Sequence, residues 1–136
     1  MKKEIIQDKD KIIAIILRSG DFPEGLNFHN SNDDFVIVST WNYPKGRKSS
    51  THSHRIAERT TNLTQEMIYL KKGKVRAKFY SEDDKLLKEV ILNEGDLIII
   101  WAGGHGFEAL EDNTQVIEAR NGPYLGIEKD KRNLDV

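Results

Sequence analysis

The sequence contains no cysteine. This excludes a disulfide framework, a zinc site built from thiolates and a cysteine nucleophile. It also removes the thiolate ligands that Cu(I) and iron–sulfur clusters require. A reducing cytoplasm is the simplest environment for such a chain, so we expect a cytoplasmic protein.

Long apolar runs are also absent. The two longest, residues 12–17 and 97–102, are far short of the ~18 apolar residues that a membrane-spanning helix needs, and the second ends at Gly103 and Gly104. The first ten residues, rich in Lys, Glu and Asp, lack the apolar segment of a secretory signal. We therefore expect a protein that neither crosses nor enters a membrane.

The sequence has no excess of charge of either sign. Its 21 basic and 22 acidic residues give a formal net charge of −1. This balance provides neither a basic field for nucleic acid nor a polybasic patch for a membrane surface. With 136 residues, 38% of them hydrophobic, the chain is long enough for one domain with its own core.

Short apolar segments, separated by turn residues, occupy most of the chain. Their alternation and β-branched content, with turns every eight to twelve residues, predict an all-β sandwich or barrel. The predicted strands are residues 12–17, 35–41, 66–70, 75–80, 86–92, 97–101, 107–110 and 114–120. We expect loops at 23–34 and 55–65, a tight bend at 103–106 and a charged C-terminal tail.

Three of the four histidines are candidate metal ligands. His52 and His54 are two residues apart, so on a strand they would project from one face, about 6.6 Å apart along the backbone. Glu66 opens one predicted strand and His105 follows another, so all four side chains could meet at one ion. A helix over residues 51–59 is the alternative, and it would turn His52 and His54 to different faces. His29 has no partner at ligand spacing, so we interpret it as a surface or capping residue.

These residues occur in two motifs that resemble those of the cupins, which are small jelly-roll barrels. Gly46, His52-Ser53-His54, Glu66 and Gly73 fill the first motif, while Gly95, Gly103 and His105 fill part of the second. The sequence departs from the family in two ways. Eleven residues separate His54 from Glu66, more than is usual, and in the second motif Trp101 replaces a proline and His105 comes one residue early.

The resemblance implies a single cupin-type domain over residues 1–136, a double-stranded β-helix or jelly-roll barrel. Its core would cover about residues 35–120, with the tail at 125–136 outside it. It implies a metal held by His52, His54, Glu66 and His105. Three imidazoles and one carboxylate suit Fe, Mn, Ni, Zn or Co, and the sequence does not select among them.

Short cupins of this kind are associated with surface-sugar and polysaccharide biosynthesis. The resemblance therefore implies a metal-dependent isomerase, epimerase, lyase or dioxygenase acting on a small polar metabolite such as a sugar or sugar nucleotide. The alternative is a non-catalytic module that binds or senses a small molecule or a metal. The family also suggests a homodimer, for which the apolar segment 12–17 could serve as an edge strand.

Further residues could act around the metal. Glu118 and Arg120 share one face of a predicted strand, and Glu108 is a third candidate for proton transfer, although an exposed Glu–Arg pair of this kind is often only a surface ion pair. Phe107 shares the parity of His105 and would line the site. Trp101, Arg76 and Tyr124 could line a pocket or simply pack.

Two positions have an alternative. Gln65 would point to the opposite face from Glu66, and a neutral amide is the poorer ligand. Arg47 and Lys48 could meet an anionic group such as a sugar phosphate, but a solvated basic loop is the interpretation we favour.

Overall fold

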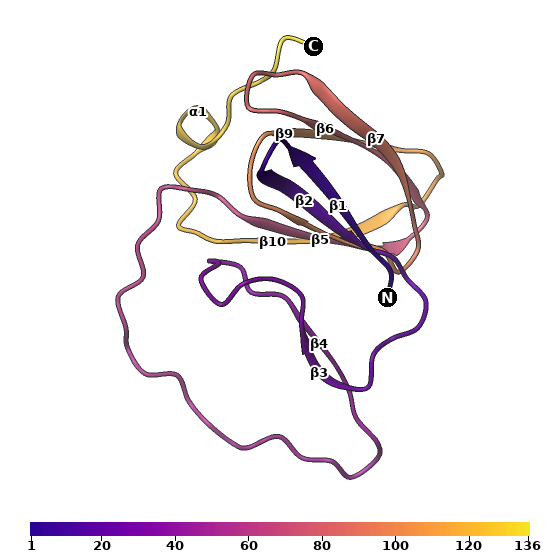
Figure 1. The fold of residues 1–136 in the computed structure, drawn as a ribbon, viewed down its shortest axis with the longest axis vertical. Helices are drawn as coiled ribbons and strands as arrows, with labels where there is room; N and C mark the ends of the chain where they lie inside the picture. Colours follow the sequence, from indigo (N-terminus) through magenta and orange to yellow (C-terminus); the bar gives the residue numbers. More distant parts are fainter.

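The computed structural model describes all 136 residues, which form two antiparallel β-sheets that face each other (Figure 1). One sheet has five strands in the order β1 (Lys3–Asp8), β2 (Lys11–Leu17), β8 (Leu97–Ile100), β5 (Glu66–Lys72) and β10 (Gln115–Arg120). The other has three, in the order β7 (Leu86–Asn93), β6 (Lys74–Tyr80) and β9 (Gly104–Ala109). The predicted all-β class is confirmed. No helix of the structure is both long and apolar enough to cross a membrane.

Two further elements complete the chain. The strands β3 (Gly25–Phe28) and β4 (Ser39–Asn42) form a separate two-stranded hairpin. One short helix, α1 (Ile127–Asp130), lies in the C-terminal tail.

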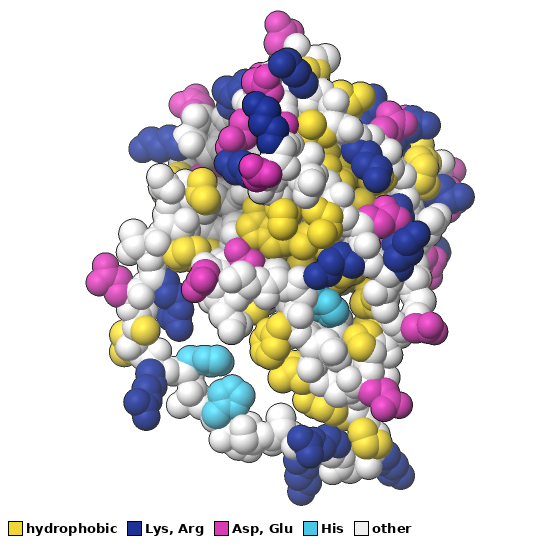
Figure 2. All heavy atoms as spheres, viewed as in Figure 1, with side chains coloured by type: hydrophobic (Ala, Val, Ile, Leu, Met, Phe, Trp, Pro, Cys, Tyr) yellow, Lys and Arg dark blue, Asp and Glu magenta, His cyan; other side chains and the backbone are white.

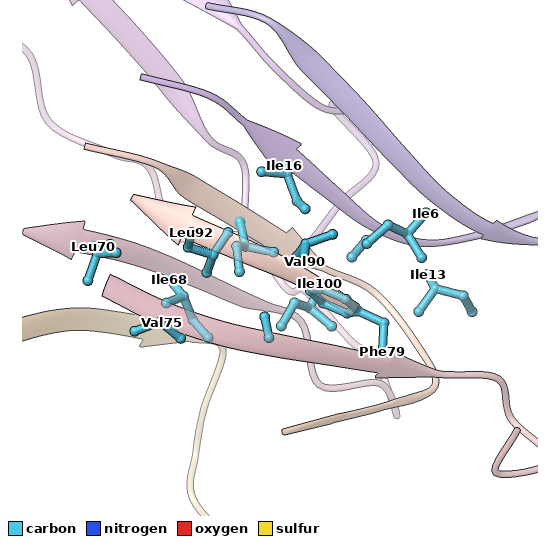
Figure 3. Close-up of a cluster of buried hydrophobic side chains, with 13 residues drawn as sticks. Ile6, Ile13, Ile16, Ile68, Leu70, Val75, Phe79, Val90, Leu92 and Ile100 are labelled. Carbon is cyan, nitrogen blue, oxygen red and sulfur yellow. The ribbon is translucent and has the colours of Figure 1, made fainter. Parts of the chain in front are cut away.

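The core lies between the two large sheets. Along β6, buried Val75, Ala77 and Phe79 alternate with partly exposed residues, because successive side chains of a strand point to opposite faces. Side chains from β5 and β8 meet them from the other sheet (Figure 3). Each large aliphatic side chain buried in this way contributes roughly 1.5–3 kcal/mol.

At the N-terminal side one strand was not predicted, and one predicted loop and one predicted strand need correction. Residues 3–8 form β1 because they pair with β2, although only Ile6 among them is buried and the alternation is weak. The predicted loop 23–34 contains β3. The predicted strand 35–41 is reduced to β4, because the side-chain oxygen of Gln65, rather than a strand, accepts hydrogen bonds from the amides of Phe35 and Val36.

The predicted bend at residues 103–106 is also wrong. β9 begins at Gly104, so His105 lies within a strand, directly opposite Phe79. The turn is made by Gly103, which has φ +68°, and a Cβ there would lie 2.1 Å from the carbonyl oxygen of Tyr80. Since Phe79 faces the core, His105 faces the same way.

The segment 12–17 is not an edge strand. β2 pairs with β1 on one side and with β8 on the other, and residues 13–17 are buried. The suggested dimer contact through this strand is therefore ruled out. The edges of the five-stranded sheet are β1 and β10.

Residues 43–64, between β4 and β5, contain no helix or strand, and we call them the arm. The arm loops out from the sheets before it returns at β5 (Figure 1). The alternative helix over residues 51–59 does not form. By contrast, the charged tail is attached to the body, because Arg132 donates two hydrogen bonds, of 2.7 and 2.8 Å, to the carboxylate of Asp84.

Candidate functional site

Glu66, His105 and Arg120 converge at one end of the space between the two sheets. The Nε2 atom of His105 lies 3.2 Å from Oε2 of Glu66, and a guanidinium nitrogen of Arg120 lies 3.6 Å from Oε1. The register explains this meeting. Arg120 is paired with Glu66 across β10 and β5, and His105 faces inward from β9 in the opposite sheet.

Glu66 is the buried member of this group. Only 8% of the residue is exposed, and its inward parity is shared with Ile68 and Leu70, as the alternation predicts. The hydrogen bond from His105 holds the pKa of the Glu66 carboxyl below its ordinary value, the Arg120 charge adds to this, and burial opposes it. The carboxylate is therefore ionised at neutral pH and is available as a ligand for a cation or as an acceptor.

The three side chains line a cleft of about 1160 Å³. Its walls come from the end of the arm, the start of β9, the residues after β10 and the C-terminal tail. Residues 61–64, 102–106, 120–125 and 130–134 line it. The cleft is polar as well as apolar, and it is large enough for a small metabolite.

His52 and His54 lie outside this cleft. Both are exposed in the arm, where their rings form a T-shaped pair with centroids 5.2 Å apart. Nδ1 of His52 is 2.9 Å from the carbonyl oxygen of Ser50, also in the arm. The space-filling view shows the histidine side chains of the arm bordering an opening between the arm and the sheets (Figure 2).

Two of the four predicted metal ligands, Glu66 and His105, lie close together. The 3.2 Å between Nε2 of His105 and Oε2 of Glu66 suits two ligands of one ion, since bonds of about 2.1 Å at tetrahedral or right angles place ligand atoms ~3.0–3.4 Å apart. However, no three His, Asp or Glu side chains come together in a group able to hold a metal. The four predicted ligands are thus divided into two pairs, one in the body and one in the arm.

Two other predicted site residues lie on the outer face of the three-stranded sheet. Arg76 alternates with buried Val75 and Ala77 and is bonded to Glu108 at 2.6 Å and to Glu89 at 3.1 Å. Glu108 therefore belongs to a surface ion-pair cluster and is not part of the cleft. The physical reason is that the side chains of Arg76 and Glu108 point away from the interior, whereas the side chain of His105 points into it.

Trp101 is also separate from the cleft. Its indole N–H donates a 2.8 Å hydrogen bond to Asp34, in a second cavity near the β3–β4 hairpin. This bond joins the hairpin to the body, so the side chain has a structural role.

The remaining candidates lie close to the Glu66 group. Arg120 bonds to Glu118 at 3.1 Å, and its guanidinium lies over the ring of Tyr124, 5.4 Å from the centroid. The Phe107 ring lies beside that of His105, with centroids 5.4 Å apart. Tyr124 lines the cleft, Phe107 faces the same interior, and Glu118 reaches the group through Arg120.

The sequence reasoning missed the C-terminal tail as part of the site. Residues 130–134 line the cleft, and Leu134 packs against Gly104, where an added Cβ would lie 2.3 Å from its Cδ1 atom. Leu134, an apolar residue among the polar and charged residues 128–135, was the available signal in the sequence. His29, in contrast, has the capping role expected, with its Nε2 atom 2.8 Å from the Thr40 hydroxyl.

No family model matches this chain, and no similar curated protein or solved structure was found.

Proposed function

We propose that the chain is a metal-binding protein of the cupin type, with Glu66 and His105 as two of the metal ligands. The observation that carries the proposal is the 3.2 Å approach of the His105 and Glu66 side chains within a large polar cleft. A buried carboxylate beside an imidazole, on facing strands, is a natural pair of donors for a divalent cation.

His52 and His54 would provide the other two ligands. Neither ring is engaged outside the arm, and their i, i+2 spacing lets both face one ion on an extended segment. When bound, a divalent cation would act as a Lewis acid on a carbonyl or hydroxyl oxygen of the ligand.

A small polar ligand, such as a sugar or sugar nucleotide, would fit this cleft. Arg120 contributes a guanidinium group and Tyr124 an aromatic face. An isomerase, epimerase or lyase would also need a proton acceptor, for which Glu118 is the nearest candidate outside the ligand set. A dioxygenase would turn over aerobically with iron and fail with zinc, which separates these classes.

The test is the metal content of protein purified from cells grown without added metal. We expect a stoichiometric amount of a divalent transition metal in the wild type. Replacing Glu66 with Gln, His105 with Ala, or His52 and His54 together with Ala should lower that content by about tenfold or more, because each removes a donor.

His29→Ala is the matched control. Its imidazole binds Thr40 within the β3–β4 hairpin, so the metal content should not change. Full metal content in the His52/His54 double variant would contradict the ligand set proposed here.

A second candidate function is a metal-free binding module. The observation that favours it is that Arg120 and His105 already satisfy the Glu66 carboxylate, so the group is complete without a cation. Purified protein without metal, whose melting temperature is unchanged by a chelator, would support this function over the first.

A further inference from the structure

The two large sheets are open along one side. β10 pairs only with β5, and β9 pairs only with β6. Each therefore has one edge with unpaired backbone N–H and C=O groups. Since a single turn connects β9 and β10, both open edges border the same side of the molecule.

Side chains that face the interior are exposed on this side. Phe107 is opposite buried Ala77, and Val116 is opposite buried Leu70, so both point toward the space between the sheets. Yet Phe107 is 42% exposed and Val116 45% exposed. The interior lacks a cover here, although the sheets are packed elsewhere.

The arm has the features of such a cover. His52, His54 and Ile56 share one face of an extended segment, and Ile56 is fully exposed. Residues 44–60 make hydrogen bonds only to other residues of the arm. The arm thus has unpaired backbone groups and an uncovered apolar side chain beside its two histidines.

We propose that the arm of a second copy of this chain pairs with the open edge of β9, and that two copies exchange their arms about a two-fold axis. The proposal rests on the proposed function, because the exchanged arm would place His52 and His54 beside the Glu66–His105 pair of the other copy. Each metal site would then contain residues of both copies, and neither copy would have a complete site alone.

The position of the arm favours a second copy over the arm's own body. The arm extends away from its own sheets across an opening (Figures 1 and 2), and it does not lie over its own β9 (Figure 1). Its C-terminal end is fixed, because Asn121 donates a hydrogen bond to Leu63 and the neighbouring Gln65 accepts one from Val36. An extended segment on a fixed base, next to an open edge, suits reciprocal exchange, a low-cost route to a symmetric dimer.

The first experiment is cross-linking in a chain that has no cysteine of its own. Ser53→Cys places a thiol in the arm. Gly106→Cys places one on β9, where an added Cβ meets no atom within 4 Å. The two single variants are unfolded together, refolded as a mixture and treated with a short bis-maleimide. We expect a covalent dimer of one Ser53→Cys chain and one Gly106→Cys chain.

The control pairs Ser53→Cys with Lys88→Cys on β7, at the opposite edge of the three-stranded sheet, and should give no such product. A chain carrying both Ser53→Cys and Gly106→Cys shows whether the arm lies on β9 of its own chain or on β9 of a second copy. A cross-link within one chain, or a wild-type protein that is monomeric by light scattering, would overturn the exchange.

The second experiment separates this proposal from the metal proposal. His52→Ala/His54→Ala protein and Glu66→Gln/His105→Ala protein, each expected to be metal-free, are refolded together. In an exchanged heterodimer one site has all four ligands and the other has none. Random pairing makes about half of the dimers heterodimers, so about a quarter of the wild-type metal content should return. If the cross-link forms but the metal does not return, the arms are exchanged and the proposed ligand set is wrong. If a wild-type monomer contains the metal, the metal proposal holds and the exchange is wrong.

Discussion

At the scale of single residues, the most constrained charged group lies away from the cleft. Asp96 is only 3% exposed. Its carboxylate accepts hydrogen bonds from Arg18 and from the amides of Ser19 and Asn93, each at 2.8 Å. It therefore ties the end of β2 to the turn between β7 and β8.

Replacing Asp96 with Asn should lower the free energy of unfolding by about 2–4 kcal/mol, because it removes the more buried of the two charges that compensate Arg18 and leaves one backbone donor poorly satisfied. Urea unfolding followed by circular dichroism measures this loss. Asp112→Asn, on an exposed turn, is the control and should change the stability by less than about 0.5 kcal/mol. Equal stabilities for the two variants would contradict this role for Asp96.

The same arginine makes stability depend on pH. The hydrogen bonds from Arg18 hold the pKa of the Glu4 carboxyl below its ordinary value of 4.5. Because the folded-state pKa is the lower one, this contribution is complete above pH 4.5 and is lost as the pH falls through the folded value.

In Glu4→Gln, the decrease in stability below pH 4.5 should be shallower than in the wild type. At neutral pH the variant should be less stable by about 0.5–1.5 kcal/mol, the usual value of a partly exposed pair of this kind. Urea midpoints at a series of pH values measure both effects. Parallel pH profiles for the two proteins would show that Glu4 does not contribute.

At the scale of elements, the start of β9 decides which way His105 points. Gly103 has a positive φ of +68°, and the carbonyl oxygen of Tyr80 lies where its Cβ would be. Any side chain at this position would be strained by its backbone angle and would collide with β6.

Gly103→Ala should therefore lower the free energy of unfolding by about 1–3 kcal/mol or more. Gly106→Ala is the matched control on the same strand. It has no positive φ, and an added Cβ meets no neighbour within 4 Å, so its effect should be small. Thermal unfolding measures the difference, and similar midpoints for the two variants would contradict the proposed turn geometry.

At the scale of the whole molecule, the body and the arm are distinct parts. The 13 residues of the core cluster come from strands of the two large sheets, and none comes from the arm. The sheets should therefore fold without the arm's own sequence, while metal binding and exchange should depend on it.

Replacing residues 47–58 with a Gly/Ser segment of equal length tests this division. We expect cooperative unfolding and an unchanged β-type circular dichroism spectrum, because no core contact is lost. The protein should become monomeric and metal-free, and its melting temperature should no longer depend on protein concentration. A variant that fails to fold would show that the arm belongs to the core.

Local patterns in the sequence were sufficient to predict most strands of the two large sheets. From Glu66 to Arg120, alternation and turn residues correctly predicted six strands and the inward direction of Glu66, Ile68 and Leu70. These features depend on periods of two residues and on glycines at turns, which are properties of a few neighbouring residues. The pairing of β1 and β3 was not predictable in this way, because their partners, rather than their own sequences, make them strands.

The same distinction, between features set by neighbouring residues and features set by the tertiary structure, applies to the candidate site. The sequence by itself determined that Glu66 faces the interior, because parity along a strand is local. The inward direction of His105 depended on β9 beginning at Gly104, which the sequence did not predict. Only the tertiary structure decided that these two side chains meet at 3.2 Å beside Arg120 and that His52 and His54 remain apart in the arm. The physical reason is that the eleven residues between His54 and Glu66, mostly polar, carry no periodic hydrophobic pattern. Where such a segment goes depends on open strand edges elsewhere in the fold.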